Sequence, residues 1–398
     1  MDKTKENNII NFPDHQIADI ENSVKVNKTQ KKRKKNNSSH FIILVAIVTF
    51  VFTVIVFSIL DNSEFNSTDA VNTEPISILS TANYCFADYK EGYVFAKDGK
   101  ISCYNTNQEL QWEIDSSKTA PTIMTNGEYV LTYYNKDKLA VVTNGAKTHK
   151  IKTDGNVIYG SVNKNGYCAL IVEEDGFKSQ IAVYDNKGKL KVKWHNSERY
   201  IASVALSDNN KTLIASEIKL LDSDVNSSVL ITDIRSELSF DEIDFKDSVI
   251  CDLKFNSKNK FIAVLDDRTV CYSTGKNQKW RIDYAGKNLY TYDISNTNNI
   301  ALVFDKDDSA LSNSVVEFYN ESGKQIGSYA SESRIYKLDM QEKTSLIAYD
   351  RNIEVVNSKG RVISSGKLNV DIHDSIFMGN KKCALVLSGS GASLVKPE

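Results

Sequence analysis

Short apolar runs recur at regular spacing through most of the chain. They read YVFAKD, YVLTYY, YCALIVE, TLIASEI, FIAVLDD, NIALVFD, SLIAYDR and KCALVLS, and they begin at residues 93, 129, 167, 212, 261, 299, 345 and 382. Their starts are 36, 38, 45, 49, 38, 46 and 37 residues apart, a mean close to 41. A repeat of this length in a chain without helical periodicity is typical of a β-propeller.

Each run has similar neighbours. A weaker strand and a polar turn precede it, as in LKFNSKNKFIAVL, and a third strand, a turn and often a fourth strand follow it. Four antiparallel strands in each unit make a propeller blade. Eight runs favour eight blades, with seven as the alternative. The last unit ends after its third strand, so we predict that Ile76–Ser80 closes a propeller formed by residues 76–398.

Three tryptophans share one position in the repeat. Trp112, Trp194 and Trp280 each follow, by eight to ten residues, a tyrosine at the end of a third strand. A catalytic side chain would not recur on separate blades, whereas a large aromatic that packs one blade against the next would do so. We therefore predict a structural role for all three.

The stretches CYNTNQELQWEID, VYDNKGKLKVKWHN and CYSTGKNQKWRIDY, read with the repeat, resemble the pyrroloquinoline-quinone-like propeller superfamily. The whole layout is similar to an uncharacterised Firmicutes family of membrane-anchored propeller proteins. The resemblance implies architecture and location. Enzymes of the superfamily bind quinone and calcium, but the sequence has no adjacent cysteines and no alignable ligand set. We expect no cofactor and no enzymatic activity, and a quinone-dependent oxidoreductase is the less favoured alternative.

Residues 41–60, FIILVAIVTFVFTVIVFSIL, contain no charge and are long enough to span a bilayer as a helix. A buried core helix and a cleaved signal peptide are the competing interpretations. The long preceding region and the absence of a small-x-small cleavage site favour an uncleaved anchor. We expect a basic, largely disordered tail at 1–40, a transmembrane helix at 41–60 and a polar linker at 61–75.

Charge predicts the orientation of this anchor. Seven basic residues lie between Lys25 and Lys35, whereas the linker DNSEFNSTDAVNTE has no Lys or Arg. The positive-inside rule places the tail in the cytoplasm and the propeller outside the cell membrane, with the bilayer as the partner of residues 41–60. Residues 1–40 hold nine Lys/Arg against five Asp/Glu, and the rest of the chain is acidic. We therefore exclude nucleic acid as a partner.

Candidate binding residues lie in loops between second and third strands. These connections are enlarged and acidic in three units, and all of them are expected on one face of the propeller. The candidates are Glu173, Glu174, Asp175, Asp222, Asp224, Asp305, Asp307 and Asp308. The stretch DSDVNSSVLITD has the ligand spacing of a calcium loop but lacks its glycine, so solvated loops are favoured over metal sites. The cysteines and histidines show no metal-ligand spacing, and free, buried cysteines are expected.

These features predict a membrane-anchored binding or scaffolding module at the cell envelope. Its partner, a protein or another envelope ligand, would occupy the loop face or the central channel. A transmembrane sensor that couples an external ligand to a cytoplasmic partner of the tail is the alternative.

Overall fold

A computed structural model describes residues 72–75, 85–97, 99–116, 118, 121–197, 199–221, 224–236, 239–305, 313–378, 383–389 and 391–396. All of them belong to the compact unit Phe65–Glu398. Their regular elements are β-strands, and within these ranges no helix has the length and apolar character needed to cross a bilayer. The predicted tail at 1–40 and anchor at 41–60 lie outside the described residues.

The described strands form six four-stranded sheets and one seven-stranded sheet, all antiparallel. The first three sheets along the chain are β2 (Cys85–Tyr89), β3 (Gly92–Lys97), β4 (Lys100–Asn105) and β5 (Leu110–Asp115); β6 (Thr122–Asn126), β7 (Tyr129–Tyr133), β8 (Asp137–Thr143), β9 (Thr148–Val162), β10 (Cys168–Glu173), β11 (Ser179–Tyr184) and β12 (Leu190–Asn196); and β13 (Tyr200–Leu206), β14 (Thr212–Leu221), β15 (Asp224–Asp233) and β16 (Asp241–Phe245).

The remaining four sheets are β17 (Ile250–Ser257), β18 (Lys260–Leu265), β19 (Arg268–Ser273) and β20 (Gln278–Asp283); β21 (Asn288–Ile294), β22 (Ile300–Asp305), β23 (Ser314–Tyr319) and β24 (Gln325–Ala330); β25 (Lys337–Gln341), β26 (Thr344–Tyr349), β27 (Asn352–Asn357) and β28 (Val362–Lys367); and β29 (Ile372–Met378), β30 (Cys383–Ser388), β31 (Gly391–Lys396) and β1 (Asn72–Pro75). The eight apolar runs of the repeat form β3, β7, β10, β14, β18, β22, β26 and β30.

Strand β9 explains the seven-stranded sheet. Its first part pairs with β8, from Thr148 opposite Thr143, and its last part pairs with β10, ending with Val162 opposite Cys168. Gly155 lies between the two parts, where a Cβ would clash with the carbonyl oxygen of Glu173. One continuous strand therefore serves as the last strand of one four-stranded group and the first strand of the next.

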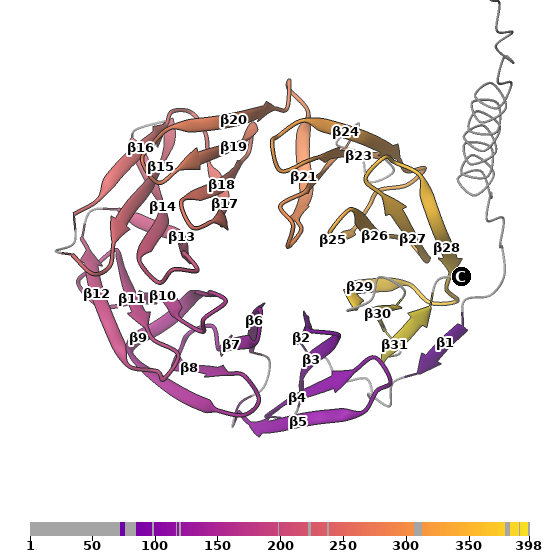
Figure 1. Ribbon diagram of the computed structural model, residues 1–398, viewed down its shortest axis with the longest axis horizontal. Coiled ribbons are helices and arrows are strands. Elements are labelled where there is room, and N and C mark those ends of the chain that lie inside the picture. The colour runs from indigo at the N-terminus through magenta and orange to yellow at the C-terminus, as the bar shows by residue number, and fades with distance from the viewer. Residues whose placement is uncertain are drawn as a thin grey trace, which may run out of the picture. The chain divides into compact units, whose positions relative to one another are not determined.

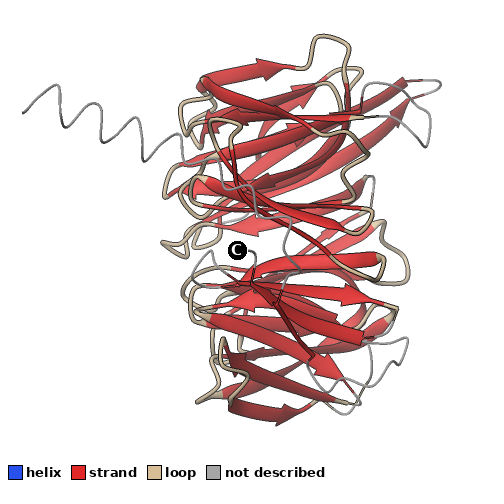
Figure 2. Ribbon diagram, turned by 90° about the vertical axis from the view of Figure 1, so that its right-hand side faces the viewer, coloured by secondary structure: helices blue, strands red, loops and turns tan. Residues whose placement is uncertain are grey.

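The sheets are arranged around a common axis, with the first strand of each group innermost and the last outermost (Figure 1). Seen from the side, the sheets follow one another around the ring, and their strands run across the thickness of the disc (Figure 2). Contacts between β2 and β29 close the ring. The outermost strand of the last sheet is β1, which pairs with β31 from Asn72 opposite Lys396 to Pro75 opposite Ser393. The closing strand thus directly precedes the predicted segment 76–80, which lies outside the described residues.

The core consists of clusters between neighbouring sheets, because both faces of each sheet are covered. Along β10, Cys168, Leu170 and Val172 pack into one cluster. Ala169 and Ile171 point to the other face and pack with Val204 and other residues of β13 and β14. Because both faces of each sheet are covered, the second strands are apolar throughout instead of alternating with polar residues. Burial of each large aliphatic side chain contributes about 1.5–3 kcal/mol to the stability of the fold.

The three tryptophans lie on outermost strands and contact the next sheet. Trp194 packs on Phe240, with ring centroids 4.4 Å apart. The Trp280 Nε1–H donates to the carbonyl oxygen of Glu321 at 3.0 Å, beside Gly323. Trp112 lies against Gly145 in the equivalent turn, where a Cβ would approach the indole Cδ1 to 2.5 Å.

Candidate binding surface on one face of the ring

In five innermost strands, the pairing with the neighbouring second strand skips one residue, which leaves a β-bulge. The skipped residues are Ile158, Ala202, Cys251, Tyr290 and His373. Such β-bulges re-aim a side chain out of the regular pleat. Each of the five is exposed, as is Tyr336, which immediately precedes β25. We call these six residues the axial collar.

The axial collar lies on the face that carries the second-to-third connections. The Tyr290 ring stacks under the guanidinium of Arg334 at 4.7 Å, and Arg334 forms an ion pair at 2.5 Å with Asp305, the last residue of β22. A Cβ at Gly389, between β30 and β31, would lie 3.7 Å from His373. Bulged side chains and loop residues therefore form one surface.

Four carboxylates gather further along the innermost strands. Desolvation by the surrounding ring raises the pKa of Asp88 although the residue is exposed, with a further contribution from Asp293, and burial raises the pKa of Asp252. Burial and then Asp293 raise the pKa of Asp339 to about 8. These four residues come from β2, β17, β21 and β25. Asp293 contributes to the raised pKa of each of the other three, so the four carboxylates lie within electrostatic reach of one another, and we call them the axial aspartates.

Two of the axial aspartates bind the innermost strand of the following sheet. The Asp293 Oδ2 accepts from the Met340 backbone N–H at 2.6 Å, and the Asp339 Oδ2 accepts from the Phe377 N–H at 2.7 Å. On the preceding sheet, the Lys254 ammonium donates to the carbonyl oxygen of Ile294. Innermost edges have no strand partner on the axis side, so side chains satisfy these backbone groups.

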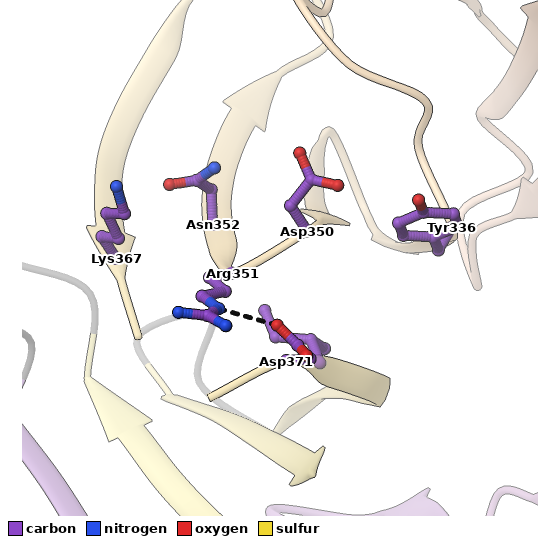
Figure 3. Close-up of a pocket in the computed structure, with 7 residues that line it drawn as sticks. Tyr336, Asp350, Arg351, Asn352, Lys367 and Asp371 are labelled. Carbon is purple, nitrogen blue, oxygen red and sulfur yellow. Dashed lines mark hydrogen bonds and ion pairs between the residues drawn. The ribbon is translucent and has the colours of Figure 1, made fainter. Parts of the chain in front are cut away.

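A pocket of about 360 Å³ opens on the same face, where the sheet β25–β28 meets β29. Its lining consists of Tyr336, Asp350, Arg351, Asn352, Lys367, Asp371 and Ile372. The Arg351 Nε donates to Asp371 Oδ1 at 2.7 Å, while Asp350, Asn352 and Lys367 extend to the same side of the turn (Figure 3). Tyr336 belongs to both the pocket and the axial collar.

The predicted acidic loop residues lie in different environments. Glu173 and Asp175 are exposed, and Glu174 accepts from Gln180 and lies 3.3 Å from His195. The Asp305 side chain is 5% exposed and bound to Arg334, so it is a structural ion-pair partner.

From Asp224 onward, the stretch DSDVNSSVLITD is a strand and not an open loop. Asp224 begins β15, where it pairs with Leu221, and the strand continues to Asp233. A calcium loop is incompatible with this extended ladder. Asp222, Asp307 and Asp308 lie outside the described residues.

None of the six cysteines forms a disulfide. Cys103, Cys168, Cys271 and Cys383 are buried as expected, whereas Cys85 is half-buried and Cys251 is exposed. Cys251 departs from the expectation because it is the bulged residue of β17. Within the described ranges, no group of three His, Cys, Asp or Glu side chains is arranged to hold a metal ion.

Sequence reasoning missed the axial aspartates. A signal exists: VICDLKF, YTYDISN and YKLDMQE each place an aspartate in the weak strand ahead of an apolar run. Recognising it requires the register of the first strand, which the bulges at Cys251 and Tyr290 shift by one residue in β17 and β21.

Comparison with solved structures finds the same architecture. The propeller of Dos1 is 12% identical, with a TM-score of 0.55, and the match covers 81% of this chain and 95% of that one. A eukaryotic initiation factor is 12% identical at a TM-score of 0.49, over 74% and 90% of the two chains. The C-terminal WD40 domain of Sif2 is 10% identical at 0.42, over 70% and 96%.

The Dos1 match supports a β-propeller fold and nothing beyond the fold, because its sequence identity is low. A search of curated proteins gives no significant match. A model of the family of unknown function DUF5711 matches residues 61–396, which is most of the chain. The chain therefore belongs to the DUF5711 family.

Proposed function

We propose that this protein is a membrane-anchored, non-enzymatic binding module whose β-propeller binds a partner at the cell envelope through the axial collar. The observation that carries this proposal is the recurrence of exposed bulged side chains on five innermost strands. Bulges interrupt pairing and are common next to functional surfaces. Their repetition on one face gives a partner several contacts at once.

The proposed propeller has eight blades. Counting β9 in two adjacent blades divides the seven-stranded sheet into two four-stranded groups, β6–β9 and β9–β12. The six other sheets then supply one blade each. We also propose that the propeller is related to the pyrroloquinoline-quinone-like propellers. The tryptophans on the outermost strands of three blades support this relationship.

Site-specific photo-crosslinking in cells tests the binding surface. A photoreactive residue at position 290 or 336 is expected to give a discrete crosslinked species. The same residue at exposed Lys279, on the outermost strand β20, serves as the control. Crosslinks that are equally strong from position 279, or absent from both axial positions, would contradict the proposal.

Cysteine labelling in intact cells tests the proposed anchoring and orientation. In a Cys251→Ser background, Lys279→Cys should react with a membrane-impermeant maleimide before lysis. Asn27→Cys, in the basic tail, should react only after lysis. The reverse pattern would place the propeller in the cytoplasm.

A further inference from the structure

We propose that the pocket between the sheet β25–β28 and β29 is a binding site for a neutral saccharide. This inference deepens the proposed function, since it names a ligand class for one part of the binding face. It is argued from the charge, the shape and the chemical character of the pocket lining.

The charges of the lining cancel. Asp350 and Asp371 carry the negative charges, and Arg351 and Lys367 carry the positive ones. Arg351 and Asp371 already neutralise each other through their 2.7 Å contact. A site built for an ion would present an excess of the opposite charge. This lining instead offers many hydrogen-bond donors and acceptors without a net field, which suits an uncharged ligand rich in hydroxyl groups.

Tyr336 provides a flat apolar surface beside these polar groups. Its side chain is 49% exposed, although burial of an aromatic ring is strongly favoured. The carbon-bearing face of a sugar ring is apolar and planar enough to cover it, while the sugar's hydroxyls reach sideways. Asp350 and Asn352, at the turn between β26 and β27, and Lys367, at the end of β28, extend toward one side (Figure 3), where they can meet those hydroxyls.

The size of the pocket sets the length of the ligand. Its volume of about 360 Å³ is at the lower end of the range for small-molecule sites. It accommodates a short saccharide unit and excludes a folded protein segment. A longer glycan would place one such unit in the pocket and leave the rest in solvent.

Calorimetric titration of the full-length protein in detergent tests the inference. The probes are the neutral disaccharides chitobiose, cellobiose and maltose. We expect saturable binding of at least one probe. Tyr336→Ala should weaken it by up to about tenfold, whereas Tyr336→Phe, which keeps the ring, should retain it. Tyr200→Ala removes an equally exposed tyrosine (48%) that lies outside both the pocket and the axial collar, and it should have no effect.

Salt dependence distinguishes a neutral ligand from an ionic one. The affinity for the bound disaccharide should stay within about twofold between low and high salt, because screening acts on net charges. Absence of binding to all three probes, or equal binding by Tyr336→Ala, overturns the saccharide site. Neither result affects the crosslinks expected from position 290, so failure of this inference is distinguishable from failure of the proposed function.

Discussion

At the scale of single residues, the ring depends on close contacts between an aromatic side chain and a glycine in the next sheet. Gly323 has a φ of +74° and lies against the Trp280 ring, where a Cβ would approach to 2.8 Å. The glycine therefore satisfies two requirements: a left-handed turn and room for the indole. Both requirements repeat at Gly145 opposite Trp112.

Gly323→Ala is expected to lower the free energy of unfolding by about 2–4 kcal/mol, since backbone strain and overpacking add. Urea denaturation measures the loss. Gly286→Ala is the matched control, because Gly286 has a φ of +79° but no neighbour within 4 Å of an added Cβ. That variant should lose only about 1 kcal/mol. Equal losses of unfolding free energy in the two variants would show that the contact with Trp280 contributes nothing to the cost of Gly323→Ala.

Asp339 makes stability depend on pH. Burial and nearby Asp293 raise its pKa to about 8 in the folded protein, while an unfolded chain releases this proton near pH 4. Between these values the folded state binds more protons, so the contribution of Asp339 to stability falls as pH rises. Asp339→Asn keeps an acceptor for the Phe377 N–H and should raise the free energy of unfolding at pH 8 by at least about 1 kcal/mol.

Thermal unfolding of wild type and Asp339→Asn at pH 5 and pH 8 checks this prediction: the advantage of the variant should grow with pH. Asp374→Asn is the control, because Asp374 forms a partly exposed ion pair with Lys337 at 2.9 Å. Its effect should stay below about 1 kcal/mol. A constant difference between Asp339→Asn and wild type at both pH values would refute the assignment.

At the scale of strands, each bulge exposes one side chain while the residues on either side of it keep their pairing partners. Leu289 pairs with Phe304 and Thr291 with Val303, so the ladder passes over Tyr290. Deletion of Tyr290 should restore a regular ladder and change stability by less than about 1 kcal/mol, while removing the side chain from the collar. Deletion of Tyr292, which is paired with Leu302, should shift the register and unfold the sheet.

Circular dichroism and urea titration separate these two deletions. A Tyr290 deletion as damaging as the Tyr292 deletion would mean that the bulge is required for folding.

The strands also show what the sequence can and cannot predict. All eight apolar runs became second strands, because burial on both faces leaves a run of apolar residues that composition alone reveals. The bulges were not predicted, since one extra residue in a weak first strand leaves no mark on periodicity. The polar residues of DSDVNSSVLITD predict a loop. There β14 and β15 extend as a long hairpin, paired as far as Leu221 and Asp224.

At the scale of the whole molecule, stability depends on closure of the ring. β1 covers the edge of β31, with four residue pairs between them. The need for a closing strand was predicted from the missing fourth strand, but its place was not. The predicted segment 76–80 is richer in apolar residues, whereas pairing with β31 involves the polar stretch NTEP. Backbone hydrogen bonds, which have no sequence signature, supply this contact.

Removal of β1 is therefore expected to destabilise the entire propeller. A variant that begins at residue 76 should unfold at lower urea concentration than one that begins at residue 72, by about 2–4 kcal/mol for the lost hydrogen bonds. It should also self-associate through the exposed β31 edge. Both variants lack residues 1–71, so the difference reports β1 alone. Urea titration and light scattering measure the two effects, and identical behaviour would contradict them.

The pairing of β1 with β31 also determines when the ring can close during synthesis of the chain. The ribosome makes Asn72–Pro75 before any other strand of the described ring and Gly391–Lys396 after all of them. The last sheet stays incomplete until Gly391–Lys396 has left the ribosome, however early the other sheets form. A nascent or truncated chain therefore presents an unclosed edge, and quality control can distinguish it from the finished protein by that edge.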